Sequence, residues 1–558
     1  MLEDYIIFLL IGSSIIFFYR RLRVLMHFFQ QEEYDNERFL NYSIKGFRLI
    51  DKKFSLVLLF LTFLNYVSFI SSVFFLLSSF FIVSIFSYLE RNPCKRAKKV
   101  LSITMRVKRI LSFSLLILFI ALIAFLMFFN LRSSFILGLL IICIIQILPL
   151  ILISSNIVLT PFEKKIQNRY LKEAKKKMAD LQPMVIGITG SYGKTSVKHI
   201  LYHILSSVFP TLKTPGSVNT QMGITRIIRE ELREDHKYFI VEMGAYGRGS
   251  IECLCELTPP HYGIITCVGN AHYERFKSIE NVARAKFELN KSVKDQKGYT
   301  FVNADGIEKR FIESYGEDLI HIGKGSLDQE CTENSFLEKF YKQTPKNIKD
   351  SYLVSDIKQT KEGLQFKIVH KGEEFFLKVP LHGIHHVENI ALCFALAQKI
   401  GIDPYVIVAA LCSVPQIKHR LEVIKSEKGP TIIDDAYNSN PIGFSSALLV
   451  LNTLKKDDGR RILVTPGMVE LGEIHDEKHR ELGKEASKCV DVVLVISPGR
   501  IRSFIDSFEK NMNENQRVYQ FNTFAEAKEW IKSNIEEKDT VLYENDLPDL
   551  YESVCPFA

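Results

Sequence analysis

The sequence has 558 residues with a net charge of +8, and this length predicts three or four structural units. The ten cysteines are scattered, and their only close pair is Cys253 and Cys255, which argues against a disulfide framework or a zinc site and indicates reduced thiols. The basic residues gather beside apolar runs, without a basic stripe carrying interleaved aromatic residues, so the charge predicts a membrane surface and no nucleic acid as partner.

The first part of the chain predicts membrane helices. Residues 5–18 form a short apolar run with arginines behind it, whereas a signal peptide has its basic residues in front, so we interpret the run as a first membrane helix. Residues 54–89 are too long for one span and predict a helical hairpin that turns near residues 65–72. Residues 110–129 and 135–159 are each long enough to span and carry almost no charge, so buried core helices are a poor alternative. Four or five helices result.

Basic clusters set the orientation of these helices. Residues 91–109 and 164–177 are rich in lysine and arginine, and such clusters stay on the cytoplasmic side. The short polar turn at residues 130–134 is then external, and everything after about Pro161 is cytoplasmic. We therefore predict a multi-pass protein of the inner (cytoplasmic) membrane, with membrane lipid as a partner and its catalytic domains in the cytoplasm.

A phosphate loop follows the apolar region. A buried strand is expected at residues 183–187, a helix is expected from Val197, and a glycine-rich turn joins them. Glycines let backbone N–H groups surround phosphate oxygens, Lys194 would neutralise the β- and γ-phosphates, and Thr195 would reach magnesium. The predicted nucleotide-binding residues of this loop are Gly190, Ser191, Gly193, Lys194, Thr195 and Ser196. The loop alone does not decide between a motor, a kinase, a GTPase and a ligase.

Three further motifs follow in order. Glu242-Met-Gly-Ala ends a strand, Asn-Ala-His272-Tyr-Glu-Arg-Phe-Lys-Ser follows another, and Ala-Lys286-Phe-Glu has a helical pattern. With the phosphate loop, this succession resembles the central domain of the Mur ligases, closest to the branch that adds D-alanyl-D-alanine. The resemblance implies an ADP-forming ligase that joins a carboxylate to an amine through an acyl-phosphate.

The resemblance also implies a metal site. The attack of a carboxylate on the γ-phosphate brings two anions together, so the reaction needs magnesium to screen their repulsion. The implied metal ligands are Thr195, Glu242, His272 and Lys286, the last as a carbamate. Without the motif, the helical pattern would predict that Lys286 is a solvated helix lysine. The implied catalytic residues are Lys194, His272, Lys286 and Arg420, with ATP and Mg²⁺ required.

The second half of the implied site comes from three more motifs. Residues 383–389 resemble the family's Gly-x-His-Asn-x-x-Asn, with His386 in place of the first Asn and with Asn389 matching. Residues 419–422 resemble Gly-Arg-x-Glu, with His419 for Gly, and here Arg420 would reach the γ-phosphate. The turn after residues 431–435 resembles the start of the third Mur domain, where the implied contacts to ribose and adenine are Asp435, Tyr437 and Asn438.

We therefore predict an α/β protein behind N-terminal transmembrane helices. The predicted division is a transmembrane region at 1–160, a basic cytoplasmic linker at 161–182, a central P-loop ATP-binding domain at 183–417 and a Rossmann-like C-terminal domain at 418–558, in which strands alternate with helices. No protein partner is inferred, and the number of subunits stays open.

Departures from the family pattern leave the substrates open. The expected UDP-sugar domain cannot be placed before Pro183, Ser250 stands where the branch often has Glu, and residues 543–549 replace its Lys-Gly-Ser-Arg. The first hypothesis is a ligase that adds an amino acid or a dipeptide to a cell-envelope precursor. The alternatives are a Mur-like ligase outside peptidoglycan synthesis, of the poly-γ-glutamate synthase type, and a non-catalytic membrane scaffold. A scaffold needs none of the catalytic residues that are retained.

Overall fold

The computed structural model describes residues 2–44, 51–90, 92–94, 100–128, 134–269, 276–315, 319–324, 351–426, 429–437, 439–469 and 471–546. The described chain divides into two compact units, a helical unit up to Ile166 and an α/β unit at residues 167–546. One helix, α6, belongs to both units, and the predicted basic linker at residues 161–182 forms its last turns up to Leu181.

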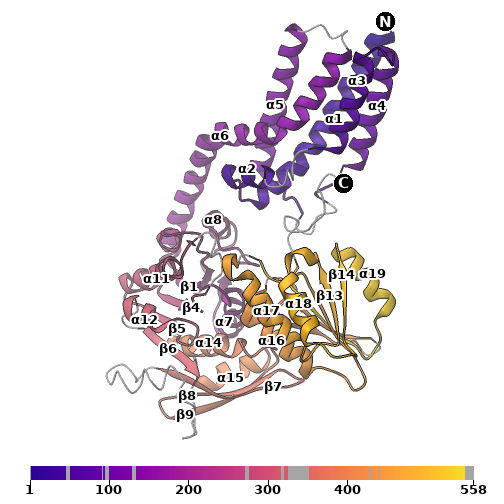
Figure 1. Ribbon diagram of the computed structural model, residues 1–558. Helices are drawn as coiled ribbons and strands as arrows, with labels where there is room; N and C mark the ends of the chain where they lie inside the picture. Colours follow the sequence, from indigo (N-terminus) through magenta and orange to yellow (C-terminus); the bar gives the residue numbers. More distant parts are fainter. Residues whose placement is uncertain are drawn as a thin grey trace. The chain divides into compact units, whose positions relative to one another are not determined.

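The helical unit contains the apolar blocks that the sequence predicts (Figure 1). Its helices are α1 (Leu2–Gln31), α2 (Asn36–Ile44), α3 (Lys53–Tyr66), α4 (Ser72–Leu89), α5 (Met105–Phe128) and α6 (Ser134–Leu181). By length and composition, α1, α4, α5 and α6 are long and apolar enough to cross a membrane, and α3 is a shorter apolar helix. The predicted hairpin is confirmed, because α3 ends at Tyr66 and Ser71 caps α4 by accepting a hydrogen bond from the Phe74 N–H at 3.3 Å. The first helix is longer than its apolar run indicated.

Charged side chains tie the helical unit together beside its apolar core. Arg21 is buried and lies 2.9 Å from Asp51 and 2.9 Å from Glu90, so it connects α1 to the start of α3 and the end of α4. The Arg109 guanidinium forms a two-pronged pair with Glu163, at 2.5 and 2.8 Å, which joins α5 to α6. Buried carboxylates therefore accompany these two arginines.

The first part of the α/β unit is built on a nine-stranded sheet of order β2-β3-β1-β4-β5-β6-β7-β8-β9. The strands up to β7 pair in parallel, and β7, β8 and β9 pair antiparallel, an extension that the sequence did not predict. The elements are β1 (Met184–Thr189), α7 (Lys194–Ser206), β2 (Thr211–Lys213), α8 (Gln221–Glu230), β3 (Tyr238–Glu242), α9 (Ser250–Leu257), β4 (Tyr262–Ile265), α11 (Ile279–Asp295), β5 (Tyr299–Asn303), α12 (Lys309–Tyr315), β6 (Leu319–Lys324), β7 (Tyr352–Gln359), β8 (Leu364–His370), β9 (Glu373–Val379), α14 (His386–Ile400) and α15 (Pro404–Cys412).

Helices cover both faces of the sheet near β1. Ile186 and Ile188 belong to the core shared with α7, α14 and α15, whereas Val185 belongs to the core shared with α8, α9 and α11. This alternation follows from the two-residue period of a strand, and it makes β1 apolar along its whole length. The central strand is thus fixed on both sides, and its carboxyl end holds the phosphate loop steady.

The second part of the α/β unit is a six-stranded sheet of order β10-β11-β15-β12-β13-β14, in which β10 runs antiparallel. The predicted strands and their alternation with helices are confirmed. The elements are β10 (Glu422–Ile424), β11 (Thr431–Asp435), α16 (Pro441–Thr453), β12 (Arg461–Thr465), η3 (Gly472–Ile474), α17 (His475–Ala486), β13 (Val492–Ile496), η4 (Pro498–Arg500), α18 (Arg502–Asn511), β14 (Arg517–Phe521), α19 (Phe524–Asn534) and β15 (Thr540–Glu544).

Candidate active site

The phosphate loop lies at the carboxyl end of β1, between the ends of β3 and β4. Gly193 has φ +81°, and a Cβ there would lie 2.8 Å from Asn389 Oδ1, while a Cβ at Gly190 would collide with the Thr266 side chain. Both positions therefore require glycine. Helix α7 starts directly behind the loop at Lys194, so its first N–H groups and its dipole favour an anion here.

Lys194 folds back over the loop that precedes it. Its Nζ donates hydrogen bonds to the Gly190 carbonyl at 2.6 Å and to the Ser191 carbonyl at 3.3 Å. Burial lowers the pKa of Lys194, the Glu242 carboxylate opposes this shift, and the nearby Arg420 adds to it. An ammonium in this place faces the space that the loop encloses, where a phosphate would restore its charged form.

Glu242 ends β3 and brings the first two predicted metal ligands together. Its Oε2 accepts a hydrogen bond from Thr195 Oγ1 at 3.1 Å, and its Oε1 accepts one from Asn219 Nδ2 at 3.2 Å. Glu242 is 1% exposed, so its carboxylate is out of reach of bulk water. A carboxylate and a hydroxyl in contact are the oxygen donors that Mg²⁺ prefers, and the residues present therefore fit this ion.

Lys198 is a member of the site that the sequence analysis missed. Its side chain is wholly buried, and its Nζ donates to Glu242 Oε2 at 2.8 Å and to the Gly216 carbonyl. Burial lowers the pKa of Lys198, and the contact with Glu242 opposes the shift. The sequence signal is its spacing, because a residue four positions after Lys194 lies on the same side of α7.

Lys286 lies on α11 and is 4% exposed. Burial and repulsion from Lys194 lower the pKa of Lys286 to about 7, and Cys267 opposes the shift. No carboxylate pairs with Lys286 among the residues that the structure describes. The helical pattern alone predicts a solvated lysine here, and this prediction is wrong because the inner face of α11, which carries Lys286, packs on the sheet.

Glu288, the last residue of the same motif, has a different task. Its carboxylate accepts hydrogen bonds from the backbone N–H groups of Gly249 at 2.7 Å and of Ile251 at 3.1 Å. It therefore caps the start of α9 and joins that helix to α11. The capping explains the glutamate without a contact to substrate, and the sequence analysis gave it no role.

The segment after β4 holds the loop in place. The Ser191 N–H donates to the Cys267 carbonyl at 3.0 Å, and the Gly269 N–H donates to Ser191 Oγ at 2.8 Å. The Thr266 hydroxyl donates to the Tyr192 carbonyl. Two predicted site residues, His272 and Asn438, lie outside the described residues.

The start of α14 supplies the next part of the site. Asn389 is 6% exposed, and its Nδ2 donates to the His385 carbonyl at 3.2 Å, which directs its Oδ1 toward Gly193. Burial lowers the pKa of His385 to about 4 and holds the pKa of His386 well below its usual range. Among the described atoms, His385 Nδ1 is a buried nitrogen without a hydrogen-bond partner, which marks a place for a polar ligand group.

Arg420 stacks on Tyr437, with its guanidinium carbon 4.2 Å from the ring centre. The charge of Arg420 also lowers the pKa of Lys194 and of His385, so the guanidinium lies near both the phosphate loop and the start of α14. The preceding residue, His419, has φ +58°, which explains why the family pattern has glycine there. The His419 imidazole contacts Asp434, with its Nδ1 2.8 Å from Asp434 Oδ2.

Asp435 and Glu544 stand side by side at the ends of the paired strands β11 and β15. Burial raises the pKa of Asp435 to about 7 and raises the pKa of Glu544 well above its usual range. Asp435 Oδ1 accepts from the Leu421 N–H at 3.3 Å, and Glu544 Oε1 accepts from the Ser439 hydroxyl at 2.5 Å. Glu544 was not predicted from the sequence, and it stands where the D-alanyl-D-alanine branch has its Lys-Gly-Ser-Arg run.

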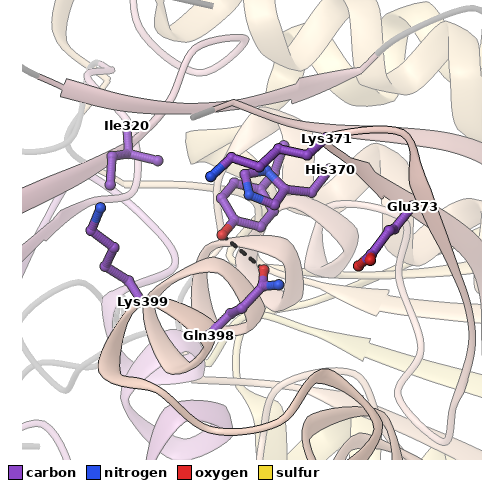
Figure 2. A pocket seen from close by; sticks show the side chains of 7 residues that line it. Ile320, His370, Lys371, Glu373, Gln398 and Lys399 are labelled. Atoms are coloured by element: carbon purple, nitrogen blue, oxygen red, sulfur yellow. Dashed lines mark hydrogen bonds between the residues drawn. The ribbon is translucent and has the colours of Figure 1, made fainter. Parts of the chain in front are cut away.

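A separate cavity of 240 Å³ lies at the far end of α14 (Figure 2). The Tyr352 ring stacks on His370 with the centroids 3.9 Å apart, and its hydroxyl donates to Gln398 Oε1 at 2.9 Å. Gln398 comes nine residues after Asn389 on α14, which is about 14 Å along a helix axis. The cavity therefore does not belong to the phosphate-binding site.

The comparisons with known proteins agree with this geometry. The family profile of the Mur ligase middle domain matches residues 188–397, and that of the Mur ligase, glutamate ligase domain matches residues 419–543. This chain belongs to the Mur ligase family. Members of the family are ATP-dependent, ADP-forming ligases, and this activity is consistent with the phosphate loop and the paired Thr195 and Glu242.

Individual relatives show how far the likeness extends. The UDP-N-acetylmuramoyl-tripeptide–D-alanyl-D-alanine ligase of Bacillus subtilis is 29% identical over 370 residues, which is 66% of this chain and 74% of the relative. The enzyme of that name from Escherichia coli is 28% identical over 316 residues, 57% of this chain and 64% of its own length.

Two solved structures share the fold. MurF from Acinetobacter baumannii has a TM-score of 0.55 at 23% identity and covers 68% of this chain and 77% of its own. The MurF ligase of Thermotoga maritima, solved with ADP, has a TM-score of 0.55 at 22% identity, with 68% and 80% covered. The family match does not include the helical unit, because it begins at residue 188, after that unit has ended.

Proposed function

We propose that this protein joins the carboxylate of a cell-envelope precursor to the amine of an amino acid or of a D-alanyl-D-alanine-like dipeptide. The observation that carries the proposal is the group formed by Lys194, the Thr195–Glu242 pair and the buried Lys286 at the end of β1. The printed names of the relatives support the choice of substrates, because they describe a muramoyl-tripeptide and D-alanyl-D-alanine.

The proposed reaction has two steps that balance. A carboxylate oxygen of the acceptor attacks the γ-phosphorus of ATP, the bond from that phosphorus to the ADP oxygen breaks, and an acyl-phosphate forms. The amine nitrogen then attacks the acyl carbon and loses a proton, the bond from carbon to the phosphate oxygen breaks, and phosphate leaves. Lys194 and Arg420 would hold the charge of the transferred phosphoryl group, and each charge-bearing donor of this kind contributes about 3–4 kcal/mol to the barrier reduction.

We place the metal site at Thr195, Glu242, Lys286 and His272. Bound Mg²⁺ supplies charge screening between the two anions that react. The ε-amine of Lys286 has a pKa of about 7, so a large fraction is neutral and nucleophilic at neutral pH. That nitrogen would attack carbon dioxide, form an N–C bond and release a proton, and the resulting carbamate is an anionic oxygen ligand. A buried lysine of ordinary pKa would stay protonated and unreactive.

We propose that the helical unit is embedded in the cytoplasmic membrane and that the α/β unit faces the cytoplasm, where ATP is. Within the described part of the chain, four helices are long and apolar enough to span, and the basic residues flank their predicted cytoplasmic ends. A reporter fused within residues 130–134 should be external, and one after Ala558 should be cytoplasmic. An external C-terminus would contradict the use of ATP.

One observation favours a second candidate, a Mur-like ligase outside peptidoglycan synthesis. This chain has Glu544 and Asp546 at the carboxyl end of β15, where the D-alanyl-D-alanine branch has basic residues. A basic run suits the carboxylate of an incoming dipeptide, and Glu544, which is buried beside Asp435, does not supply that positive charge. An amine substrate other than D-alanyl-D-alanine is therefore the alternative.

The test is phosphate release by the purified full-length protein across acceptors and amines. The acceptors are a UDP-linked muramoyl-tripeptide and free glutamate peptides, and the amines are D-alanyl-D-alanine, single amino acids and diamino acids. We expect phosphate release only when a muramoyl acceptor and an amine are both present. Phosphate release only with the glutamate peptides as acceptors would support the second candidate. No release with any acceptor, whether UDP-linked, lipid-linked or free, would contradict both.

A further inference from the structure

A hydrocarbon-lined groove runs through the helical unit between α1, α5 and α6. Its volume is 270 Å³, near the lower end of the range for ligand pockets, about 300 Å³. Among the described residues that line it, only Ser14 has a polar side chain, and its hydroxyl already donates to the Leu10 carbonyl at 2.8 Å. Water in such a space finds no partners, so the occupant that fits is a hydrocarbon chain.

The groove opens on the side of the helices. Ile141 and Leu118 form its floor and are 3% and 9% exposed, whereas Ile15 and Phe119 form its rim and are 45% and 58% exposed. In a membrane, such a rim faces the acyl chains of the bilayer. A chain that lies in the groove therefore enters sideways from the lipid and needs no opening of the bundle.

One end of the same face carries a cation. The α5 residues of the groove follow the spacing of one helix face, from Leu115 to Leu122, and Lys108 precedes Leu115 by seven residues. Lys108 is thus on that face, about 10 Å further along the helix, and its side chain is exposed. No ion pair of Lys108 occurs among the described residues, in contrast to Arg21, which is committed to Asp51 and Glu90.

A hydrocarbon groove with a cation beyond one end matches a lipid that has an anionic head. We propose that the groove holds the chain of the acceptor itself, and that the acceptor is the muramoyl-peptide carried on a polyisoprenyl diphosphate instead of on uridine diphosphate. This inference rests on the proposed function. Helix α6 lines the groove with residues from Leu137 to Ile144 and continues to Leu181, three residues before β1 begins at Met184.

An ordinary phospholipid has the same chain and phosphate chemistry, and the test separates the two sources. The full-length protein is placed in phosphatidylcholine nanodiscs and given one tripeptide in two forms, polyisoprenyl diphosphate-linked in the disc or UDP-linked in solution. Ile15→Trp narrows the groove, and Ile16→Trp is the matched control, since Ile16 is 55% exposed and is not part of the lining.

The expected result is a KM for the lipid-linked acceptor that rises roughly tenfold or more in Ile15→Trp and stays unchanged in Ile16→Trp. The KM for ATP should be equal in all three proteins. Lys108→Gln should raise the same KM severalfold, with Lys53→Gln at the start of α3 as its control. Addition of phosphatidylglycerol to the discs should not raise the KM of the wild type.

Three results overturn the inference and leave the proposed function in place. These are turnover of the UDP-linked acceptor alone, equal KM values for Ile15→Trp and Ile16→Trp, and competition by phosphatidylglycerol, which would make the groove a general lipid site. If neither acceptor is consumed while ATP is bound, the proposed function itself fails.

Discussion

The two units of this chain bury cations in opposite surroundings. Arg21 in the helical unit has two carboxylates at 2.9 Å, so its charge is balanced in place. Lys286 in the α/β unit has no ion pair with a carboxylate among the described residues, and a second cation, Lys194, is close enough to lower its pKa. A balanced buried cation holds helices together, whereas an unbalanced one gives up its proton and becomes a nucleophile. The surroundings, and not burial itself, separate a structural charge from a reactive one.

The largest expected effect concerns the cation that faces the phosphates. Lys194→Ala should lower ATP turnover by about 10³-fold or more, because the missing charge stabilises the transferred phosphoryl group. Circular dichroism and membrane insertion should be unchanged, and the exposed Lys418→Ala serves as control. Turnover at the wild-type rate would remove the basis for the phosphate-loop assignment.

Removal of the balanced cation should destabilise the helical unit. Arg21→Met leaves Asp51 and Glu90 buried together without a counter-charge, which should cost about 3–5 kcal/mol. The measurement is thermal unfolding and protease resistance of the helical unit in detergent. The triple variant Arg21→Met/Asp51→Asn/Glu90→Gln should recover most of the loss, since it leaves no uncompensated charge. Equal stability of the single and triple variants would show that the charges do not matter.

Removal of the unbalanced cation, Lys286, should stabilise the α/β unit, whereas removal of Arg21 should destabilise the helical unit. The pKa of Lys286 is about 7 in the folded protein against 10.5 in its ordinary state, so between these pH values the unfolded chain binds more protons. Stability therefore rises with pH across this window, and the full penalty is present below pH 7. Without bicarbonate, Lys286→Met should raise stability by a few kcal/mol at pH 6.5, and the gain should shrink by pH 9.5.

Urea midpoints at the two pH values measure this gain, with the exposed Lys291→Met on the same helix as control. A destabilised Lys286→Met at pH 6.5 would mean that the amine has a buried partner. The ligase activity of a Lys286 variant is a second test of the role of this residue. Lys286→Ala should be almost inactive and partly rescued by a small carboxylic acid, which would replace the anionic ligand.

A smaller effect is expected at Lys198, which lies between the two extremes because it has one carboxylate partner. Lys198→Met should weaken Mg²⁺ binding by about 10–100-fold, since residues that hold a ligand in place have effects of this size. Glu242→Gln should weaken it further, and the double variant should be no worse than Glu242→Gln. Fully additive losses would show that Lys198 does not act through Glu242.

The sequence predicted the parts of this molecule that local patterns encode. The apolar blocks, the phosphate loop and the strand that ends at Glu242 have short-range signals, and the structure confirms them. It did not predict the antiparallel strands β7–β9, because their pairing depends on partners and not on a local motif.

Long-range partners also explain the site residues that were missed. Lys198 lies in a helical pattern where nothing marks its contact with Glu242, 44 positions away. Glu544 is one of many acidic residues until β15 pairs with β11 and sets it beside Asp435. The burial of Lys286 likewise depends on which face of α11 packs on the sheet. The family motif implied a role in the site, whereas the helical pattern alone indicated a solvated lysine.

In the proposed reaction, the site activates a carboxylate as an acyl-phosphate. The direct measurement uses an acceptor whose carboxylate oxygens are ¹⁸O, with ATP, the amine and the full-length protein, and follows the released phosphate by mass spectrometry. We expect one ¹⁸O atom in each phosphate and none in ADP, because the acceptor oxygen stays on phosphorus when the amide forms. Phosphate that carries no ¹⁸O, formed by water attack on ATP, would contradict it.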